Sequence, residues 1–380
     1  LLQDNISLNT LTCKPRFRKV SAGGLKIMLK TKFREAMLWK PLENKKVLCY
    51  LCYRKCVIPN GMLGVCYTRK NIEGKLYSIV YGKLTSMNID PIEKKPLFHF
   101  HPGSEVMSIS TVGCNFRCVF CCNWVLSQEK EVMGKSTTPE EVVKYTLSYG
   151  ANGISYTYNE PTVFFEFAYD TAKLAKKRGL FNTFVTNGYM TVEAIDEIAP
   201  YLDAATVDFK ASGDPWFHRK FMAVGDISPV FDTLLEMKRK GIFIEITDLI
   251  VPKYGDKMEY VKKLAKWVVE NLGPETPFHL IRFFPSYMLT NLPSTPIETL
   301  EKAAKIAKEE GLQYVYIGNA PGHPLESTYC PSCGKTVIQR YGFEILKWNL
   351  TEDNRCKYCK AKINIKGIFK PKYRSWLSLF

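Results

Sequence analysis

The sequence STVGCNFRCVFCCNW at residues 110–124 places Cys114, Cys118 and Cys121 in the spacing C-x3-C-x2-C, directly after the apolar run at 106–111. Thiolates are the usual ligands of iron–sulfur clusters, which normally take four of them. A zinc site would also need a fourth ligand, from the protein or from water. The loop therefore favours a compact iron–sulfur centre with one iron open to a small molecule; buried cysteines or a fragment of a zinc site are the alternatives.

The same loop, with the aromatic Phe120 immediately before its third cysteine, resembles the signature of radical SAM enzymes. In that family a 4Fe–4S cluster is bound by the three cysteines, and its open iron binds the amino and carboxylate groups of S-adenosylmethionine (SAM). The resemblance implies that one electron cleaves SAM to methionine and a 5′-deoxyadenosyl radical, which then removes hydrogen from a substrate. Cys122 stands where the family pattern leads us to expect glutamine. An alternative ligand and a radical-quenching hazard are the other interpretations; we favour a neutral packing residue.

Composition favours a soluble globular protein, because 46% of the 380 residues are hydrophobic and 24% are charged. At about 150 residues per domain, this length predicts two or three domains. We find neither an apolar run long enough to span a bilayer nor the apolar core of a secretory signal. A cytoplasmic protein without a membrane partner is therefore expected.

Eleven of the thirteen cysteines fall into three groups at metal-ligand spacing, which favours reduced, metal-bound thiolates over disulfides. The first group lies in residues 47–70 with the spacing C-x2-C-x3-C-x9-C. Four thiolates around such a hairpin suit a structural zinc, and an auxiliary iron–sulfur cluster is the alternative. The members of this group are Cys49, Cys52, Cys56 and Cys66.

The last group of cysteines pairs two C-x2-C knuckles across a gap of 22 residues near the C-terminus. This spacing predicts a zinc ribbon, a small module that metal binding helps to fold. A rubredoxin-type iron site has the same four thiolates and stays as the alternative. The ligands would be Cys330, Cys333, Cys356 and Cys359.

The formal net charge is +16, and part of it is concentrated near the two ends, at 14–46 and 357–380. Basic segments of this kind can contact nucleic acid or an acidic partner. We interpret them as solvated surface, so nucleic acid is not the favoured partner.

Short apolar strands alternate with amphipathic helices from residue 106 to about 318, which predicts a parallel α/β sheet. The expected strands are 106–112, 151–158, 182–187, 204–210, 243–251, 278–284 and 314–318. The expected helices lie near 139–149, 161–179, 192–202, 227–240, 258–272 and 296–310. Thr138 and Thr295 each precede a proline and a glutamate, which predicts capping boxes at two helix starts.

This pattern predicts an open or partial βα barrel. The resemblance to radical SAM enzymes implies a partial (βα)6-type radical SAM barrel, flanked by the N-terminal four-cysteine segment and the C-terminal zinc ribbon. The expected division of the chain is 1–46 as a basic N-terminal arm, 47–100 as the four-cysteine segment and a connector, 101–325 as the barrel, and 326–380 as the ribbon and a basic tail.

Polar residues at the carboxyl ends of the strands are the candidate SAM ligands, because that end of a barrel carries the site. The resemblance assigns the SAM amino group to the segment YNEPT, where Tyr158 and Asn159 replace the usual two glycines before the glutamate. Later strand ends would contact the ribose or carboxylate and the adenine. The candidates are Tyr158, Asn159, Glu160, Thr186, Asn187, Gly318 and Asn319.

Asp208 and Lys210 face the same way on an otherwise apolar strand, where burial is costly unless the two are paired or bind something. They resemble an aspartate and a lysine at the active site of glycyl-radical activating enzymes, where the aspartate lies at a monovalent-cation site. Arg282 could hold a carboxylate in a bidentate grip. His99 and His101 either line the substrate cleft or, as we favour, simply pack.

The leading four-cysteine segment, the core motifs and the ribbon together resemble the radical SAM proteins of the AmmeMemoRadiSam system over residues 33–365, and pyruvate formate-lyase activating enzymes more distantly. The resemblance implies an electron donor such as a ferredoxin or flavodoxin and a partner such as a Memo-like protein. The hypotheses are a radical SAM enzyme acting on an unidentified protein or modified macromolecule, a glycyl-radical activase, or a non-catalytic metal-dependent RNA- or protein-binding module.

Overall fold

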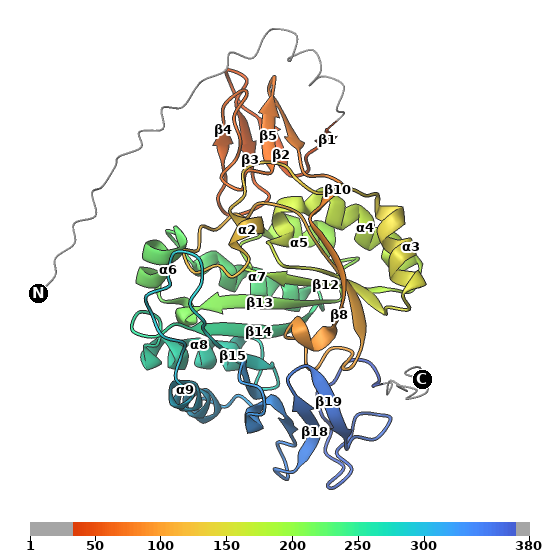
Figure 1. The fold of residues 1–380 in the computed structure, drawn as a ribbon, viewed down its shortest axis with the longest axis vertical. Helices are drawn as coiled ribbons and strands as arrows, with labels where there is room; N and C mark the ends of the chain where they lie inside the picture. Colours follow the sequence, from red (N-terminus) through yellow and green to blue (C-terminus); the bar gives the residue numbers. More distant parts are fainter. Residues whose placement is uncertain (1–32, 370–380) are drawn as a thin grey trace, which may run out of the picture. The chain divides into compact units, whose positions relative to one another are not determined.

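The computed structural model describes residues 33–369, so most of the predicted basic arm and the end of the basic tail lie outside the described residues. Its main feature is an eight-stranded sheet in the order β16-β15-β14-β13-β12-β11-β9-β8 (Figure 1). β9 and β11 to β16 run parallel, and β8 adds an antiparallel edge. The sheet is open because β16 and β8 are its two edges. The strands are β8 (Ser86–Pro91), β9 (Glu105–Ser110), β11 (Gly153–Tyr156), β12 (Phe181–Thr186), β13 (Ala204–Lys210), β14 (Phe243–Ile250), β15 (Phe278–Arg282) and β16 (Val315–Gly318).

Helices connect successive parallel strands, as the alternating pattern predicts. The predicted helices are found as α3 (Pro139–Ser148), α4 (Phe165–Lys177), α5 (Val192–Ile198), α7 (Ser228–Arg239), α8 (Met258–Asn271) and α9 (Ile297–Glu309), with the 3-10 turn η2 (Pro161–Phe164) before α4. Five further turns and helices were not predicted: α2 (Trp124–Ser127), α6 (Pro215–Met222), η1 (Ile92–Lys94), η3 (Ala211–Gly213) and η4 (Pro324–Glu326). None of the helices in this part of the chain is long and apolar enough to cross a membrane.

One of the two predicted capping boxes is present. Thr138 accepts from the Glu141 amide, and the Glu141 side chain accepts from the Thr138 amide. The second prediction was wrong, because α9 has Pro296 as its N-cap and no side-chain cap. Thr295 is buried instead, and its hydroxyl donates to the Ile250 carbonyl at 2.6 Å. A buried threonine hydroxyl must find an acceptor, and here a neighbouring strand supplies it.

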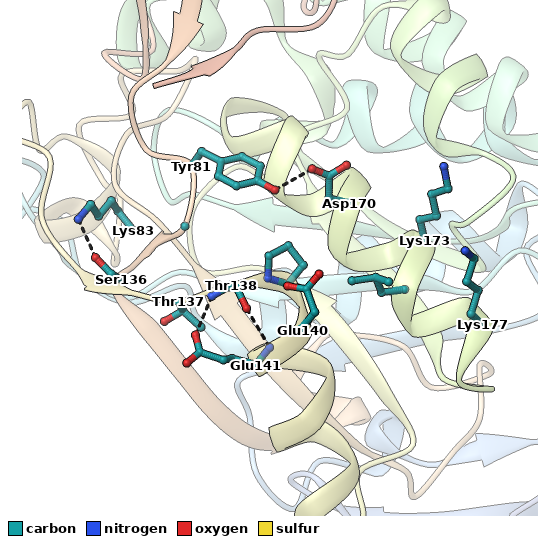
Figure 2. Close-up of a pocket in the computed structure, with 13 residues that line it drawn as sticks. Tyr81, Lys83, Ser136, Thr137, Thr138, Glu140, Glu141, Asp170, Lys173 and Lys177 are labelled. Atoms are coloured by element: carbon teal, nitrogen blue, oxygen red, sulfur yellow. Dashed lines mark hydrogen bonds between the residues drawn. The ribbon is translucent and has the colours of Figure 1, made fainter. Parts of the chain in front are cut away.

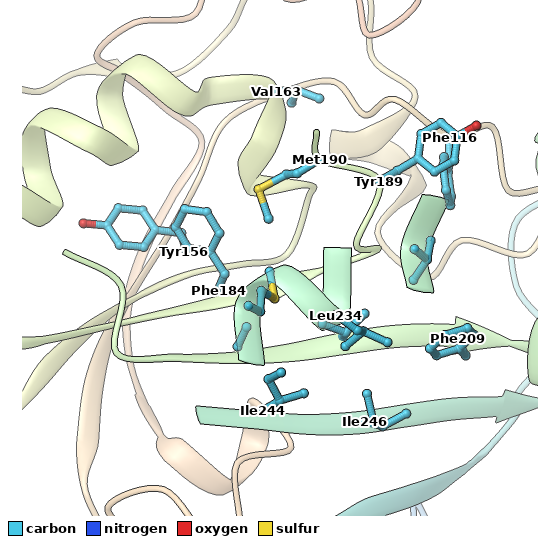
Figure 3. Packing of buried hydrophobic residues seen from close by; sticks show 14 of the residues in the cluster. Phe116, Tyr156, Val163, Phe184, Tyr189, Met190, Phe209, Leu234, Ile244 and Ile246 are labelled. Carbon is cyan, nitrogen blue, oxygen red and sulfur yellow. The ribbon is translucent and has the colours of Figure 1, made fainter. Parts of the chain in front are cut away.

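Apolar side chains of the sheet and of the helices on it form the main core. Figure 3 shows Phe184 of β12, Phe209 of β13, Ile244 and Ile246 of β14, and Leu234 of α7 in this cluster. All five are at most 9% exposed. Such packing fixes the strand ends, so the polar residues that follow them are held in place.

Two small sheets form the four-cysteine segment. One contains β2 (Trp39–Pro41), β3 (Val47–Cys49) and β4 (Val57–Ile58); the other contains β1 (Arg34–Glu35), β6 (Lys75–Ser78) and β5 (Arg69–Ile72). A two-stranded ladder pairs β7 (Lys83–Leu84) with β10 (Lys135–Ser136). The segment docks on the loop after β12, where the Tyr53 amide donates to the Tyr189 carbonyl at 3.1 Å.

The C-terminal module is a three-stranded antiparallel sheet after the turn η4 (Pro324–Glu326). Its strands are β17 (Thr328–Tyr329), β18 (Thr336–Tyr341) and β19 (Glu344–Trp348). A separate apolar cluster joins Val337 and Ile338 of β18 to Tyr316 of β16 and to Phe98. The Arg340 guanidinium also donates to the Phe98 carbonyl at 2.9 Å, so this module packs on the connector and on β16 at the edge of the eight-stranded sheet.

Candidate active site

The cysteine loop follows β9 and is held by backbone hydrogen bonds from several elements. The Arg117 amide donates to the Met222 carbonyl at 3.0 Å, and the Val119 amide donates to the Phe221 carbonyl at 2.9 Å. Cys114, Cys118 and Cys121 are free, partly buried thiols in this loop. Two of the sulfurs have polar neighbours: the Phe116 amide lies 3.4 Å from the Cys114 sulfur, and the Ser127 hydroxyl lies 3.1 Å from the Cys121 sulfur. Three thiolates in one loop fit an iron–sulfur cluster bound through three of its irons.

Glu160 is a buried carboxylate at the end of β11, 4% exposed. Its Oε1 accepts from the Thr186 hydroxyl at 2.7 Å and from the Thr162 amide at 3.1 Å. Its Oε2 accepts from the Asn187 amide at 2.8 Å. Burial raises the pKa of this carboxyl more than those hydrogen bonds lower it. A bound ammonium group would reverse that balance, because an opposite charge favours the ionised carboxylate.

Asn187 links the Glu160 carboxylate to the cysteine loop. Its side-chain amide donates to Asn115 Oδ1 at 2.7 Å and lies 4.0 Å from the Cys114 sulfur. The structure therefore brings together Glu160, Thr186, Asn187 and Cys114, which stand far apart in the sequence. This is the grouping that the strand-end interpretation predicted.

Asn159 and Tyr158 lie at the same strand end but face other groups. The Asn159 amide donates to the Gly113 carbonyl at 3.0 Å, so this side chain holds the backbone of the cysteine loop. The Tyr158 hydroxyl hydrogen-bonds to Asp90, and the Lys95 ammonium lies 4.5 Å from the centre of the Tyr158 ring. Tyr158 also has a φ of 66°, a conformation that glycine adopts more readily.

Asp208 and Lys210 form the predicted pair on β13, with 3.1 Å between the carboxylate and the ammonium. The Thr247 hydroxyl donates to the same carboxylate. Burial lowers the pKa of Lys210, but Asp208, Cys118 and Cys122 together raise it by more, so the amine stays charged. Lys210 also interacts electrostatically with Cys118 and Cys122, which places the pair beside the cysteine loop.

Arg282, Gly318 and Asn319 meet at the last two strands of the sheet. The Arg282 Nε donates to the Thr295 carbonyl at 2.8 Å, and the Asn319 amide donates to the Arg282 carbonyl at 3.1 Å. At Gly318 an added Cβ would lie 2.7 Å from Ile281 Cδ1, so the backbone there passes close to the neighbouring strand. These contacts order the strand ends, and no contact joins the three residues to the cysteine loop among the hydrogen bonds found in residues 33–369.

The two histidines pack, as we favoured. His99 is fully buried, with Nδ1 at 2.7 Å from the Asn364 carbonyl and Nε2 at 2.6 Å from the Tyr316 hydroxyl. The His101 ring stacks on Phe181, with ring centres 4.9 Å apart. Burial lowers the pKa of His99 to about 4. Both histidines therefore belong to the packing between the connector, the eight-stranded sheet and the C-terminal module.

The four C-terminal cysteines converge as a metal site would require. All their sulfur atoms lie within 4.8 Å of one another. Cys330 and Cys359 are 3.5 Å apart, and Cys333 and Cys356 are 3.8 Å apart. Four sulfurs at about 2.3 Å from one ion would be separated by about 3.8 Å, so this donor set fits zinc.

A large groove of this protein lies away from Glu160, Thr186, Asn187 and Cys114. One groove of about 820 Å³ lies between the β7–β10 ladder and helices α3 and α4 (Figure 2). It contains the Tyr81–Asp170 hydrogen bond of 2.7 Å and the Thr138 cap. None of the predicted site residues lines it.

Comparison with known proteins decides the family. The model of the Radical SAM superfamily matches residues 108–268, which include the cysteine loop and the ends of β11 to β13. The chain belongs to the radical SAM superfamily. It is 48% identical to the protein MJ0808 of Methanocaldococcus jannaschii over 335 residues, which cover 87% of this chain and 99% of that one.

Characterised relatives of this radical SAM protein are more distant. It is 28% identical to the pyruvate formate-lyase-activating enzyme of Clostridium pasteurianum over 170 residues, 42% of this chain and 67% of that enzyme. Among solved structures, it is similar to Streptococcus suis SuiB bound to S-adenosylmethionine, with a TM-score of 0.45, 14% identity, and coverage of 58% and 52% of the two chains. Membership of the superfamily implies an iron–sulfur cluster and SAM as cofactors.

Two groups of polar residues near the site were missed by sequence reasoning. Asp90 accepts from Lys94 at 2.8 Å and from Lys95 at 2.7 Å, and it also contacts Tyr158. These hydrogen bonds hold the pKa of Asp90 well below its usual range against the effect of burial. Arg54 donates to the Asn115 carbonyl at 2.8 Å. For the group around Asp90, the sequence offered only an acidic residue within the connector. Arg54 and Asn115 are 61 positions apart, so no local pattern in the sequence pairs them.

Proposed function

We propose that this protein is a radical SAM enzyme that binds a 4Fe–4S cluster through Cys114, Cys118 and Cys121 and cleaves SAM reductively. The cofactors would supply a 5′-deoxyadenosyl radical that removes hydrogen from a substrate. The observation that carries the proposal is the contact of Asn187 with both the Glu160 carboxylate and the cysteine loop. Asn187 thereby connects the Glu160 carboxylate, which suits the SAM ammonium, to the loop with the three thiols that suit the cluster.

The protein's own contribution is to position and shield these groups. Glu160 would accept hydrogen bonds from the SAM ammonium, as charge-assisted pairs favour. Thr186 and Asn187 fix the carboxylate orientation through the hydrogen bonds described above. Asn159 fixes the loop backbone at Gly113, so the thiols and the carboxylate keep their relative positions. Thr186, Asn187, Gly318 and Asn319 remain our candidates for the ribose, carboxylate and adenine contacts.

The substrate is proposed to be a protein or another macromolecule. Large side chains beside the cysteine loop are exposed, with Trp124 at 43% and Met288 at 66%. The Trp124 and Tyr287 rings stack with centres 5.0 Å apart. Aromatic residues and methionine are enriched at macromolecular interfaces. The residue pattern supports the AmmeMemoRadiSam system, with a Memo-like partner and a ferredoxin or flavodoxin as the electron donor, and a cytoplasmic location.

Asp208, Lys210 and Arg282 are the proposed substrate-side residues. Asp208 could hold a monovalent cation, although in the structure its carboxylate is taken by Lys210 and Thr247. Arg282 lies at the end of β15, where it could hold a carboxylate. For the C-terminal cysteines we propose a structural zinc ribbon.

A glycyl-radical activase is the second candidate function. It is supported by the similarity to pyruvate formate-lyase activating enzymes and by the Asp208–Lys210 pair beside the cysteine loop. A non-catalytic binding module is not favoured, because such a module needs no buried carboxylate joined to the cluster loop. Electron paramagnetic resonance (EPR) after incubation with a candidate partner tests the activase, since a glycyl radical on the partner would support it.

Anaerobic reconstitution tests the enzymatic proposal. The reduced, SAM-loaded protein should form 5′-deoxyadenosine, detected by mass spectrometry. Cys114→Ala should abolish the product, whereas Cys122→Ala is a matched control in the same loop and should retain it. Equal product from the wild type and Cys114→Ala, or none from either, would reject the proposal.

A further inference from the structure

The four N-terminal cysteines enclose a space of the size of one small ion. They line a cavity of about 20 Å³ where the N-terminal segment meets the cysteine loop and the turn η2. A cavity needs about 10–15 Å³ to hold one water-sized body, so this one accommodates a single ion and nothing larger. Its cysteines are Cys49, Cys52, Cys56 and Cys66.

Each of these four sulfurs has a hydrogen-bond donor. Two donors are side chains: Arg69 Nη1 lies 3.3 Å from the Cys49 sulfur, and the Thr68 hydroxyl lies 3.2 Å from the Cys66 sulfur. Two further donors are backbone N–H groups, that of Arg54 toward Cys52 and that of Val65 toward Cys56. Such hydrogen bonds stabilise the thiolate over the thiol, and the thiolate is the form that binds metal.

Three more N–H donors on the cavity wall are buried and have no partner within residues 33–369. They are Arg54 Nη2, Arg69 Nε and Asn115 Nδ2. Four thiolates around one divalent ion leave a surplus of negative charge, which is costly to bury unless donors and positive groups surround it. Arg54 brings a positive charge to this wall, and Arg69, which is already paired with Glu166, brings further donors.

The spacing of the sulfurs agrees with a cavity of this size. In the N-terminal segment, which lies wholly within the described residues, no three of the four sulfurs are within 4.8 Å of one another, whereas the C-terminal four are. Sulfurs that touch a water-sized body stand farther from its centre than the length of a zinc–sulfur bond, about 2.3 Å. Binding would draw each thiolate inward by about 1 Å, which rotation about the Cα–Cβ bonds allows.

We propose that the N-terminal segment binds one zinc ion through Cys49, Cys52, Cys56 and Cys66. Four thiolates around a single ion are a typical structural zinc site. The thiols release their protons as the ion binds, and no electron is transferred, because zinc has no redox chemistry. The cysteine spacing left an auxiliary iron–sulfur cluster open; a cavity of about 20 Å³ favours the single ion.

The ion would fasten the N-terminal segment to the candidate active site. Asn115, on the cavity wall, directly follows Cys114 and accepts from the Asn187 side chain at 2.7 Å. Thr162, also on the wall, donates its backbone N–H to the Glu160 carboxylate at 3.1 Å. The cavity therefore touches both parts of the candidate site; this fastening role rests on the proposed function, whereas the zinc site itself does not.

Elemental analysis of the full-length, anaerobically purified protein tests this inference without measuring SAM cleavage. We expect about two zincs and about four irons per chain, because each four-cysteine group takes one zinc and the cysteine loop takes one cluster. The double variant Cys52→Ser/Cys56→Ser should lose one zinc and keep its iron. Cys330→Ser/Cys333→Ser is the matched control: it should also lose one zinc, and cobalt(II) bound in its N-terminal site should show the absorption of tetrahedral thiolate coordination.

One zinc with about eight irons would overturn the inference in favour of a second cluster, and one zinc with about five irons in favour of a single iron. Zinc content that is unchanged in Cys52→Ser/Cys56→Ser would show that these thiols bind none. Should that variant fail to fold, the metal content of the wild type and the cobalt(II) absorption of Cys330→Ser/Cys333→Ser still decide. Absence of 5′-deoxyadenosine from a protein with two zincs would count against the proposed function and leave this site intact.

Discussion

Replacing Glu160 with glutamine removes one negative charge and keeps the size of a side chain that is 4% exposed. The carboxylate accepts at both oxygens, from Thr162 and Thr186 at Oε1 and from Asn187 at Oε2. A glutamine amide offers one acceptor oxygen and turns an N–H group toward one of these donors. We expect about 1–3 kcal/mol of lost stability, the usual effect of one unmatched buried hydrogen bond.

The larger expected effect is on SAM, because the variant no longer offers a charged acceptor to the ammonium group. A hydrogen bond to a charged group contributes about 1.5–3 kcal/mol, so the Kd for SAM should rise about 10- to 150-fold. The assay is a SAM titration of the reduced protein, followed by the change in the EPR signal of the cluster. Iron content should stay at the wild-type value, since Glu160 is not a proposed ligand of iron.

Glu245→Gln is the matched control. Glu245 is also fully buried and accepts from backbone amides, here those of Phe98 and His99 at 3.0 and 2.7 Å. It lies near the start of β14 against the connector, so its substitution should lower stability without weakening SAM binding. Wild-type affinity in Glu160→Gln, or an equal loss of affinity in Glu245→Gln, would refute the assignment of Glu160.

Three further predictions concern stability and metal content. Burial lowers the pKa of His99 from 6.5 to about 4, so protonation of this residue favours the unfolded state. The free energy of unfolding is retained above pH 6.5 and falls as the pH drops toward 4, with a loss of about 2 kcal/mol at pH 5. Urea unfolding at pH 7 and pH 5 measures this loss, which His99→Gln should reduce; an unchanged pH dependence would contradict the assignment. Thr138→Ala should cost about 1 kcal/mol of unfolding free energy through the lost cap of α3, with unchanged iron content, and a neutral result would reject the capping role. Cys330→Ser should remove about one zinc per chain by elemental analysis, and unchanged zinc would reject the ribbon site.

Local sequence signals predicted the elements that position the site. The alternation of apolar strands and amphipathic helices located every parallel strand from β9 to β16, because burial of a sheet leaves a regular pattern in the chain. The order of elements then implied which strand ends would meet. Glu160 and Asn187, 27 positions apart, are brought together for this reason.

Contacts that depend on long-range packing were not predicted. The sequence before α9 has the residues of a capping box, but Thr295 is drawn into a hydrogen bond with Ile250, 45 positions away. Tyr158 follows a strand end like its neighbours, yet its hydroxyl contacts Asp90 on β8. Both outcomes depend on which strands lie adjacent, and local patterns do not contain that information.

The spacing of the N-terminal cysteines likewise left zinc and an iron–sulfur cluster open. The structure adds the surroundings of the thiols, above all Arg69 and Asn115 with their unpaired donors. Arg69 also hydrogen-bonds to Glu166 in α4, which keeps the arginine charge compensated inside the protein. Such compensation can be seen only when the two side chains are placed in space.

The central claim is that the cluster on Cys114, Cys118 and Cys121 leaves one iron open for SAM. Electron–nuclear double resonance of the reduced protein, loaded with SAM labelled in its amino nitrogen and carboxylate oxygen, tests this claim most directly. We predict coupling of both labelled nuclei to the cluster in the wild type, with the nitrogen coupling weakened in Glu160→Gln. A fully formed cluster that shows no coupling to either nucleus would contradict the claim.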